Sequence, residues 1–182
     1  MKLARGFKSY CERVVAAVRV EMGVPGDDLL DMPSLAEHLS ISIHPLRSCL
    51  ALSKHQRDDA KVQEIYKRVS AFTFFNGCVR FIVFNDEHAP ARHRSNLAHE
   101  LAHALLLHPP EASGATAAEE ANNEAEAAWM AGVLMLTATQ AKRIAVSGMS
   151  LLAAEKKYQL SSEMLRFRLN VTGADRLMSS TA

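Results

Sequence analysis

The chain has 182 residues, of which 48% are hydrophobic, and its formal net charge is +1 at pH 7. This length suffices to bury a core and favours one domain, while the near-neutral charge gives no general case for nucleic-acid binding. No segment reaches the ~18 consecutive apolar residues of a membrane span, and the N-terminus lacks the apolar core of a signal peptide. The cysteines Cys11, Cys49 and Cys78 are an odd number in no metal-ligand spacing, which is typical of free thiols. We therefore expect a soluble cytoplasmic protein that does not contact a membrane.

The first seventy residues carry the hydrophobic patterns of short helices and one strand. The predicted elements are a helix over Leu3–Met22 that ends at Gly23 and Pro25, a helix over Pro33–Leu39, a strand at Ile41–Ile43 that Pro45 limits to an edge or a strand end, and a helix capped by Asp58 or Asp59 with Val62, Ile65, Tyr66 and Val69 on one face. Three histidines in this part, His38, His44 and His55, have no partner at a useful spacing. We expect them to be surface residues.

The clearest strand signal is the segment Ala71–Asn85. It contains two β-rich runs joined by Asn76-Gly77, the pair favoured in a two-residue type I′ turn. The sequence therefore predicts a β-hairpin that leads directly into the next helix.

The central motif of the chain is His99-Glu100-Leu101-Ala102-His103, within a run of helical periodicity. Pro90 suits the first position of this helix, and Pro109-Pro110 ends the run. Residues four apart stack on one face of a helix, so the two imidazoles can bind a single cation. A random shuffle of this composition would contain an HExxH pattern in about two per cent of cases. The alternative is a buried helix with two incidental histidines.

Glu100 is turned away from the two histidines by about a quarter of a circle, because a helix advances ~100° per residue. It therefore occupies the position of a general base, near a water at the cation but outside the coordination shell. Zinc suits such a site because it accepts nitrogen and carboxylate oxygen in a tetrahedron and, with three protein ligands, leaves one position for water. The pKa of that water falls towards ~7, and a neighbouring carboxylate can take its proton.

Two histidines need a third ligand. The arrangement with a Gly and a His at fixed positions after the motif is excluded, because Leu106 and Pro109 stand there. The remaining common solution is a Glu from a later helix. The acidic and strongly helical stretch Glu119–Leu136 offers Glu120, Glu124 and Glu126. The helix dipole alone also favours acidic residues at a helix N-terminus, so each of these carboxylates has a plain surface interpretation as well.

The rest of the chain predicts a loop and a small helical bundle. The elements are a loop over Glu111–Ala118, helices over Thr139–Val146, Ser150–Tyr158 and Ser162–Asn170, and a frayed tail from Met178. From Ala138 onward there are seven basic and three acidic residues, a balance compatible with a nucleic-acid-binding helix pair. We prefer to interpret these helices by their apolar residues, which suffice for core packing: Met149, Leu151, Leu152, Leu160, Leu165 and Leu169. Tyr158 is a possible hydrogen-bond donor to an oxyanion.

The motif and its surroundings resemble a known family. The run LAHELAHALLLHP, preceded by FIVFND and by Arg92 and Arg94, resembles the ImmA/IrrE-type metallopeptidases. Downstream, EAEAAWMAGVLML is similar to the Glu-bearing helix of that family, which is rich in small residues, Leu and Met. The resemblance extends more weakly to PSLAEHLSISIHPL near the start and to LSSEMLRFRLNVTG near the end.

The resemblance implies that His99 and His103 are zinc ligands, Glu100 is the catalytic base and Glu124 is the third ligand. The sequence departs from the family pattern at two positions, where Ala128 replaces an Asn or Asp and Thr137 replaces a closing Pro. An Asn or Asp four residues after the ligand would orient a ligand by a hydrogen bond worth ~10 to 100-fold in metal affinity or activity. Its loss implies weaker metal binding or turnover, unless Asn96 or Asn123 supplies the bond instead.

We therefore predict one metallopeptidase domain over residues 1–182, with the sheet and the Zn²⁺ core in 1–136 and a C-terminal helical subdomain in 137–176. The predicted fold class is α+β, mainly helical, with a small antiparallel or mixed sheet whose hairpin packs beside a zincin-like HExxH helix and a second, Glu-bearing helix. The predicted activity is that of a zinc endopeptidase of the gluzincin type. The resemblance implies a regulatory protein substrate, typically a DNA-binding repressor.

Three alternatives remain open on the sequence alone. In the first, the protein is a metal-binding regulator or toxin-antitoxin component that acts by contact without cleavage, an option that Ala128 supports. In the second, which we do not expect, the protein binds nucleic acid directly through the basic C-terminal helices. The third concerns the hairpin: either its free edge holds an extended substrate by main-chain pairing, or both edges are covered and the hairpin is purely structural.

Overall fold

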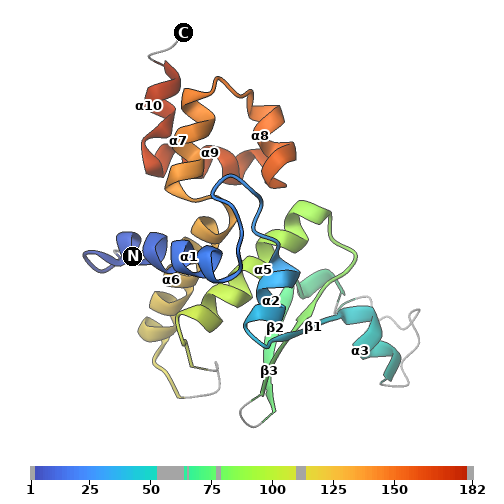
Figure 1. Cartoon of the computed structure of the whole chain (residues 1–182). Helices are drawn as coiled ribbons and strands as arrows, with labels where there is room; N and C mark the ends of the chain where they lie inside the picture. The colour runs from blue at the N-terminus through green and yellow to red at the C-terminus, as the bar shows by residue number, and fades with distance from the viewer. Residues whose placement is uncertain (1–2, 53–63, 65, 77–78, 110–113, 180–182) are drawn as a thin grey trace.

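The computed structural model describes residues 3–52, 64, 66–76, 79–109 and 114–179. Its helices and strands, in chain order, are α1 (Phe7–Glu21), α2 (Met32–His38), β1 (Ser42–Pro45), α3 (Leu46–Leu52), β2 (Ala71–Asn76), β3 (Val79–Phe84), α5 (Pro90–Leu105), α6 (Ala117–Met135), α7 (Ala138–Val146), α8 (Leu151–Tyr158), α9 (Ser162–Thr172) and α10 (Ala174–Ser179). Helices therefore dominate, and the predicted α+β class is confirmed (Figure 1).

The three described strands form one mixed sheet in the order β1-β3-β2. β1 runs parallel to β3, and β2 runs antiparallel to it, so the predicted hairpin is confirmed. The predicted turn centre is wrong by one residue, because Asn76 pairs with Val79 as the last residue of β2. This register pairs all six residues of each strand, whereas a turn centred on Asn76-Gly77 would leave Val83 and Phe84 opposite residues that precede β2. Residues 77–78 lie outside the described part of the chain.

The two faces of the sheet have different neighbours. On one face Thr73 lies opposite Ile82, which is fully buried, and α5 packs against β2 and β3. On the other face Val83 packs with Leu46 and Tyr66 in a small separate cluster. Because side chains alternate between the faces of a strand, the residues of β2 that share a face with Thr73 point towards α5.

Most of the core lies between α1, α2, α5 and α6. The inward positions expected on the first helix are confirmed, since Cys11, Val15 and Val18 are buried. That helix begins at Phe7 rather than Leu3, because Gly6 has φ 87° and so interrupts the right-handed helical conformation. The predicted helix that begins at Asp58 or Asp59 falls largely outside the described residues, although Tyr66 is helical and buried.

The boundaries of α6 are set by its first residues. Thr116 accepts a hydrogen bond from the backbone N–H of Glu119, and the Glu119 carboxylate accepts one from the backbone N–H of Thr116, which is a capping box. The helix therefore begins at Ala117, so Ala117 and Ala118 belong to it and not to the predicted loop. The earlier part of that loop, residues 111–113, lies outside the described residues.

The C-terminal helices α7, α8, α9 and α10 lie together above α1 and α6 (Figure 1). Three of them were expected, and their starts are fixed by side-chain caps from Thr137, Ser150 and Ser161. The expectation of a frayed tail over Met178–Ala182 is wrong for Met178, which belongs to α10 and packs against the core, and residues 180–182 lie outside the described part of the chain. Leu152 was expected in the core but is 61% exposed.

A buried arginine ties this C-terminal group to the first helix. Arg168 on α9 is 0% exposed, donates to a Glu12 carboxylate oxygen at 2.8 Å, and donates from Nε to the carbonyl of Leu136 at 2.8 Å. Gly132 on α6 leaves room for it, since a Cβ at that position would lie 3.2 Å from Arg168 Cδ. A charge without water must be paired in this way to be tolerated in a core.

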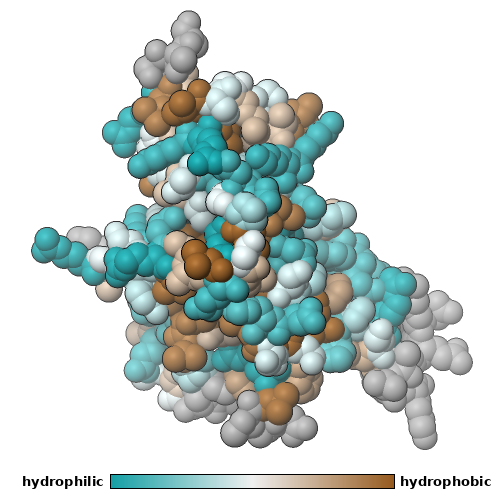
Figure 2. Space-filling model, in the orientation of Figure 1, coloured by the Kyte–Doolittle hydropathy of each residue, from teal (hydrophilic) through white to brown (hydrophobic). Residues whose placement is uncertain are grey.

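The surface is mixed in polarity. Hydrophilic residues are spread over the face shown in Figure 2, with hydrophobic residues in separate patches among them. Exposed large apolar residues include Phe74, Phe75 and Val79 on the hairpin and Leu107 after α5. Among the described residues, no helix is both long and apolar enough to cross a membrane.

Replacement of Arg168 by Ala should lower the free energy of unfolding by about 3 kcal/mol, because it leaves Glu12 without its cation and the Leu136 carbonyl without its donor. Arg166→Ala, two residues away on the exposed face of α9, should change it by less than ~0.5 kcal/mol. Urea unfolding of the two variants and the unmodified chain measures both values. Equal stabilities for the two variants would contradict the role assigned to Arg168.

Candidate metal centre

Helix α5 presents the two histidines of the central motif on one face. His99 and His103 are one helical turn apart, their ring centroids are 4.8 Å apart, and their Nε2 atoms are separated by 3.2 Å. The faces of α5 that carry Leu97, Ala98 and Leu101 are buried in the core. The helix is therefore held by packing, and the two imidazoles are directed to a common point outside it.

A carboxylate from α6 meets the two imidazoles at that point. One oxygen of Glu124 lies 3.1 Å from His99 Nε2, and the other lies 3.1 Å from His103 Nε2. A donor atom from each of the three residues lies within 4.8 Å of the other two. Glu120 lines the same pocket, and Glu126 turns towards His108. Of the three candidate carboxylates, only Glu124 is brought to both histidines.

Two imidazole nitrogens and one carboxylate form a donor set that fits zinc and leaves a coordination position open. The electrostatics of His103 agree with this fit. Burial, assisted by the neighbouring His99, lowers the pKa of His103 to about 4, although the Glu124 carboxylate opposes the shift. The imidazole is therefore neutral at pH 7, which is the form that offers a lone pair to a metal ion.

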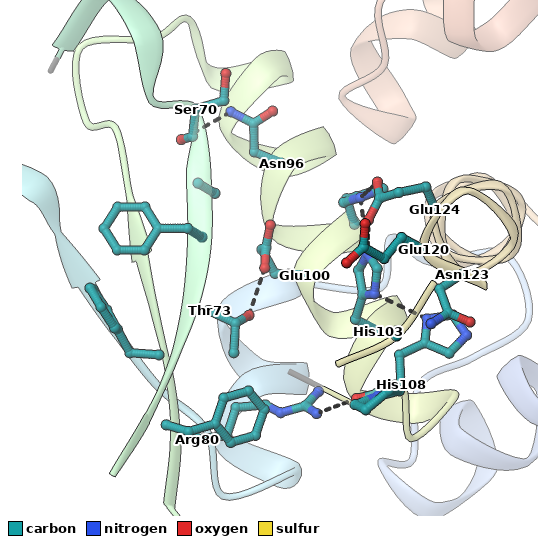
Figure 3. A pocket seen from close by; sticks show the side chains of 17 residues that line it. Ser70, Thr73, Arg80, Asn96, Glu100, His103, His108, Glu120, Asn123 and Glu124 are labelled. Atoms are coloured by element: carbon teal, nitrogen blue, oxygen red, sulfur yellow. Dashed lines mark hydrogen bonds and ion pairs between the residues drawn. The ribbon is translucent and has the colours of Figure 1, made fainter. Parts of the chain in front are cut away.

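The strand next to α5 holds the glutamate of the motif. Thr73 on β2 donates its hydroxyl hydrogen to Glu100 Oε2 at 2.6 Å, so the carboxylate is fixed between the sheet and the histidines (Figure 3). Arg80 on β3 supplies a nearby positive charge. Burial lowers the pKa of this guanidinium, and the attraction of Glu100 partly offsets that effect.

These groups line one pocket of about 910 Å³. Its walls come from β2 over residues 71–75, from the motif residues of α5, and from Glu120, Asn123 and Glu124 on α6 (Figure 3). Among the described strands, β2 pairs with β3 alone and so lies at the edge of the sheet. The pocket therefore combines three converging donor atoms, a carboxylate and an edge strand.

Sequence reasoning missed three residues at this site, namely Thr73, Arg80 and His108. The two strand residues were detectable only as alternate positions facing α5, and His108 only as a further histidine shortly after the motif. Asn96 and Asn123, the two predicted partners for a ligand, both line the pocket. The side chain of Asn96 donates to the carbonyl of Ser70 at 3.4 Å.

Three other residues singled out in the sequence lie away from this chemistry. Tyr158 was considered as an oxyanion donor, but its side chain is 1% exposed within the main core and does not line the pocket. Ala128 is exposed on α6. Thr137, at the position of the family's closing Pro, instead caps α7.

A helix with two histidines and a glutamate, crossed by a second helix that supplies a carboxylate, is the arrangement of a metallopeptidase. Comparison with protein families supports this class, since the model of the IrrE N-terminal-like domain, Peptidase M78, matches residues 36–170. The chain belongs to this family of metal-dependent peptidases. No curated protein sequence matches the chain significantly.

Replacement of Glu124 by Ala should weaken zinc binding by more than the ~10 to 100-fold typical of losing an outer hydrogen-bond partner, because it removes one of the three converging donors. Glu120→Ala, one turn earlier on the same helix, should keep the affinity of the unmodified chain. Competition with a chromophoric chelator measures both constants. The reverse pattern would move the third donor to Glu120.

Proposed function

We propose that the protein is a zinc-dependent endopeptidase of the gluzincin type, with His99, His103 and Glu124 as zinc ligands and Glu100 as the general base. The observation that carries this proposal is the convergence of the three donor atoms, all within 4.8 Å of one another, on the face of α5 next to Glu100. Membership of a metal-dependent peptidase family supports the same chemistry.

His99, His103 and Glu124 would hold zinc, which would supply Lewis-acid chemistry to the scissile carbonyl and lower the pKa of the attacking water. Glu100 takes the proton of that water and returns it to the leaving amine, as a general base and then a general acid. The hydrogen bond from Thr73 restricts the carboxylate to one orientation before the substrate binds. Little of the substrate's binding energy is therefore needed to order the Glu100 carboxylate.

Cleavage within a chain, rather than at its end, is supported by the position of β2. This edge strand contributes a continuous stretch, residues 71–75, to the pocket wall. An extended peptide can add to such an edge through main-chain hydrogen bonds. Its chain can then continue on both sides of the three donor atoms. The side chain of Phe75, which shares a face of β2 with Thr73 and is partly exposed, offers an apolar contact for the substrate's side chains.

We propose a DNA-binding repressor as the protein substrate, which also implies a cytoplasmic location. This part of the proposal rests on the resemblance of the motif region to the ImmA/IrrE-type metallopeptidases. The competing idea of nucleic-acid binding by the C-terminal helices has less support, because Leu160, Leu165 and Leu169 in that region are buried in the core.

Replacement of Glu100 by Gln should reduce peptide cleavage by ~100 to 10,000-fold, because the amide cannot take the proton of the attacking water. Zinc stoichiometry should stay unchanged, since Glu100 is outside the donor set. His99→Ala is the matched variant that should lose both zinc and cleavage. Mass spectrometry of new termini in a proteome-derived peptide mixture measures cleavage, and equal cleavage by Glu100→Gln would remove Glu100 as the base.

Thr73→Val should lower kcat roughly tenfold with little change in KM, because the isosteric side chain cannot donate to the Glu100 carboxylate. Thr73→Ser keeps a hydroxyl group and should restore most of the rate. A fluorogenic peptide selected from the mapped cleavage sites provides both kinetic constants. A rise in KM with an unchanged kcat would indicate that Thr73 contacts substrate and does not orient Glu100.

A further inference from the structure

The end of α5 turns the chain back towards the metal centre. The N–H of His108 donates to the carbonyl of His103 at 3.0 Å, and the N–H of Leu107 donates to that of Ala104 at 3.1 Å, which together form a Schellman motif. Leu107 has φ 56° at this turn, and Pro109 restricts the backbone of the residue before it to extended conformations. The backbone of His108 is therefore fixed from both sides.

The side chain of His108 lies against His103, the second histidine of the motif on α5. Its Nδ1 atom is 3.0 Å from Nδ1 of His103, and its Nε2 atom is 3.4 Å from Glu126 Oε2 (Figure 3 shows the two rings). Asn122 donates to the other oxygen of Glu126 at 2.9 Å, and Arg80 donates to the His108 carbonyl at 3.3 Å. Only 7% of His108 is exposed. The imidazole of His108 is thus held by α5 and α6 beside a candidate ligand, and its backbone is held by β3.

The positions of the ring protons follow from these contacts. Two nitrogen lone pairs at 3.0 Å would repel, so one of the two Nδ1 atoms carries a proton. A histidine that offers the lone pair of Nε2 to a metal ion carries its proton on Nδ1, which makes His103 the donor and His108 the acceptor. The proton of a neutral His108 is then on Nε2, where it faces the Glu126 carboxylate.

We infer that His108 and Glu126 are positioning residues that hold His103 as a zinc ligand. They act through two successive side-chain contacts, from Glu126 to His108 and from His108 to His103. The inference rests on the proposed function. Ligating histidines commonly donate their second N–H to a carboxylate or a carbonyl, and here an imidazole stands between the ligand and the carboxylate.

The test measures zinc affinity by chelator competition, together with the visible spectrum of the cobalt-substituted protein, which reports ligand geometry. His108→Leu should lower zinc affinity ~10 to 100-fold, because His103 loses its acceptor. His108→Asn should recover most of the affinity, since the Asn side-chain oxygen lies close to the place of Nδ1 and accepts the same hydrogen bond. Glu126→Gln should give a smaller loss with the cobalt spectrum shifted in the same direction.

The matched control is His93→Leu, which removes a half-buried histidine near the start of α5 that contacts Phe84 and not the metal centre. Its affinity and spectrum should equal those of the unmodified chain. If His108→Leu fails to fold, as judged by circular dichroism, the Asn and Gln variants carry the test. Unchanged affinity in His108→Leu, or equal losses in the Leu and Asn variants, overturns the inference while leaving the metal centre intact.

Failure of the proposed function has a different signature. In that case the unmodified chain binds no zinc, or His99→Ala binds it as well as the unmodified chain. Either result overturns the metal centre and the positioning pair together. Zinc binding that requires His99 and is insensitive to His108 overturns the positioning pair alone.

Discussion

The close packing of α5 against α6 is the constraint on which the candidate metal centre depends, because two of the possible donors come from one helix and the third comes from the other. Ala98 and Ala102 on α5 and Ala127 and Ala131 on α6 are all buried, and none has a side chain longer than a methyl group. Helices meeting through small residues approach more closely than helices meeting through Leu or Phe. Glu124 can therefore reach across to both histidines with an ordinary side-chain length.

The register of that contact is fixed by the second half of α6. This helix begins acidic and exposed and ends apolar and buried, with Met130, Val133 and Leu134 in the core. Because the buried half cannot rotate without exposing these residues, the orientation of the acidic half is determined as well. Glu124 lies one turn before buried Ala127 on the same side of the helix, which carries its carboxylate to the rim of the helix pair. The change from acidic to apolar residues along α6 thus places its second half in the core and orients the carboxylate of its first half towards the site.

The elements that could be predicted from sequence are those with a local signal. The helix of His99 and His103 follows from periodicity and a proline at its start, and the hairpin follows from two β-rich runs around a turn. The hydrogen bond between Thr73 and Glu100 could not be predicted, because it joins residues 27 positions apart and depends on which face of β2 meets α5. His108 was missed because its place depends on a left-handed Leu107, a conformation that costs a non-glycine residue ~1–2 kcal/mol and that no local pattern favours. The final helix α10 was missed because its few apolar residues gain their burial only from the bundle around it.

Each functional side chain of α5 is held by a different part of the fold. Glu100 is held by the sheet through Thr73, His103 contacts the turn at the end of its own helix through His108, and both histidines face α6 through Glu124. The site therefore forms only when the sheet, the helix pair and the turn are all in place. An unfolded chain presents no such convergence, so any metal ion bound here stabilises the native state in proportion to the logarithm of its concentration above Kd. The same linkage means that changes far from the pocket which loosen α5 from α6 act on metal affinity through geometry, without touching a donor atom.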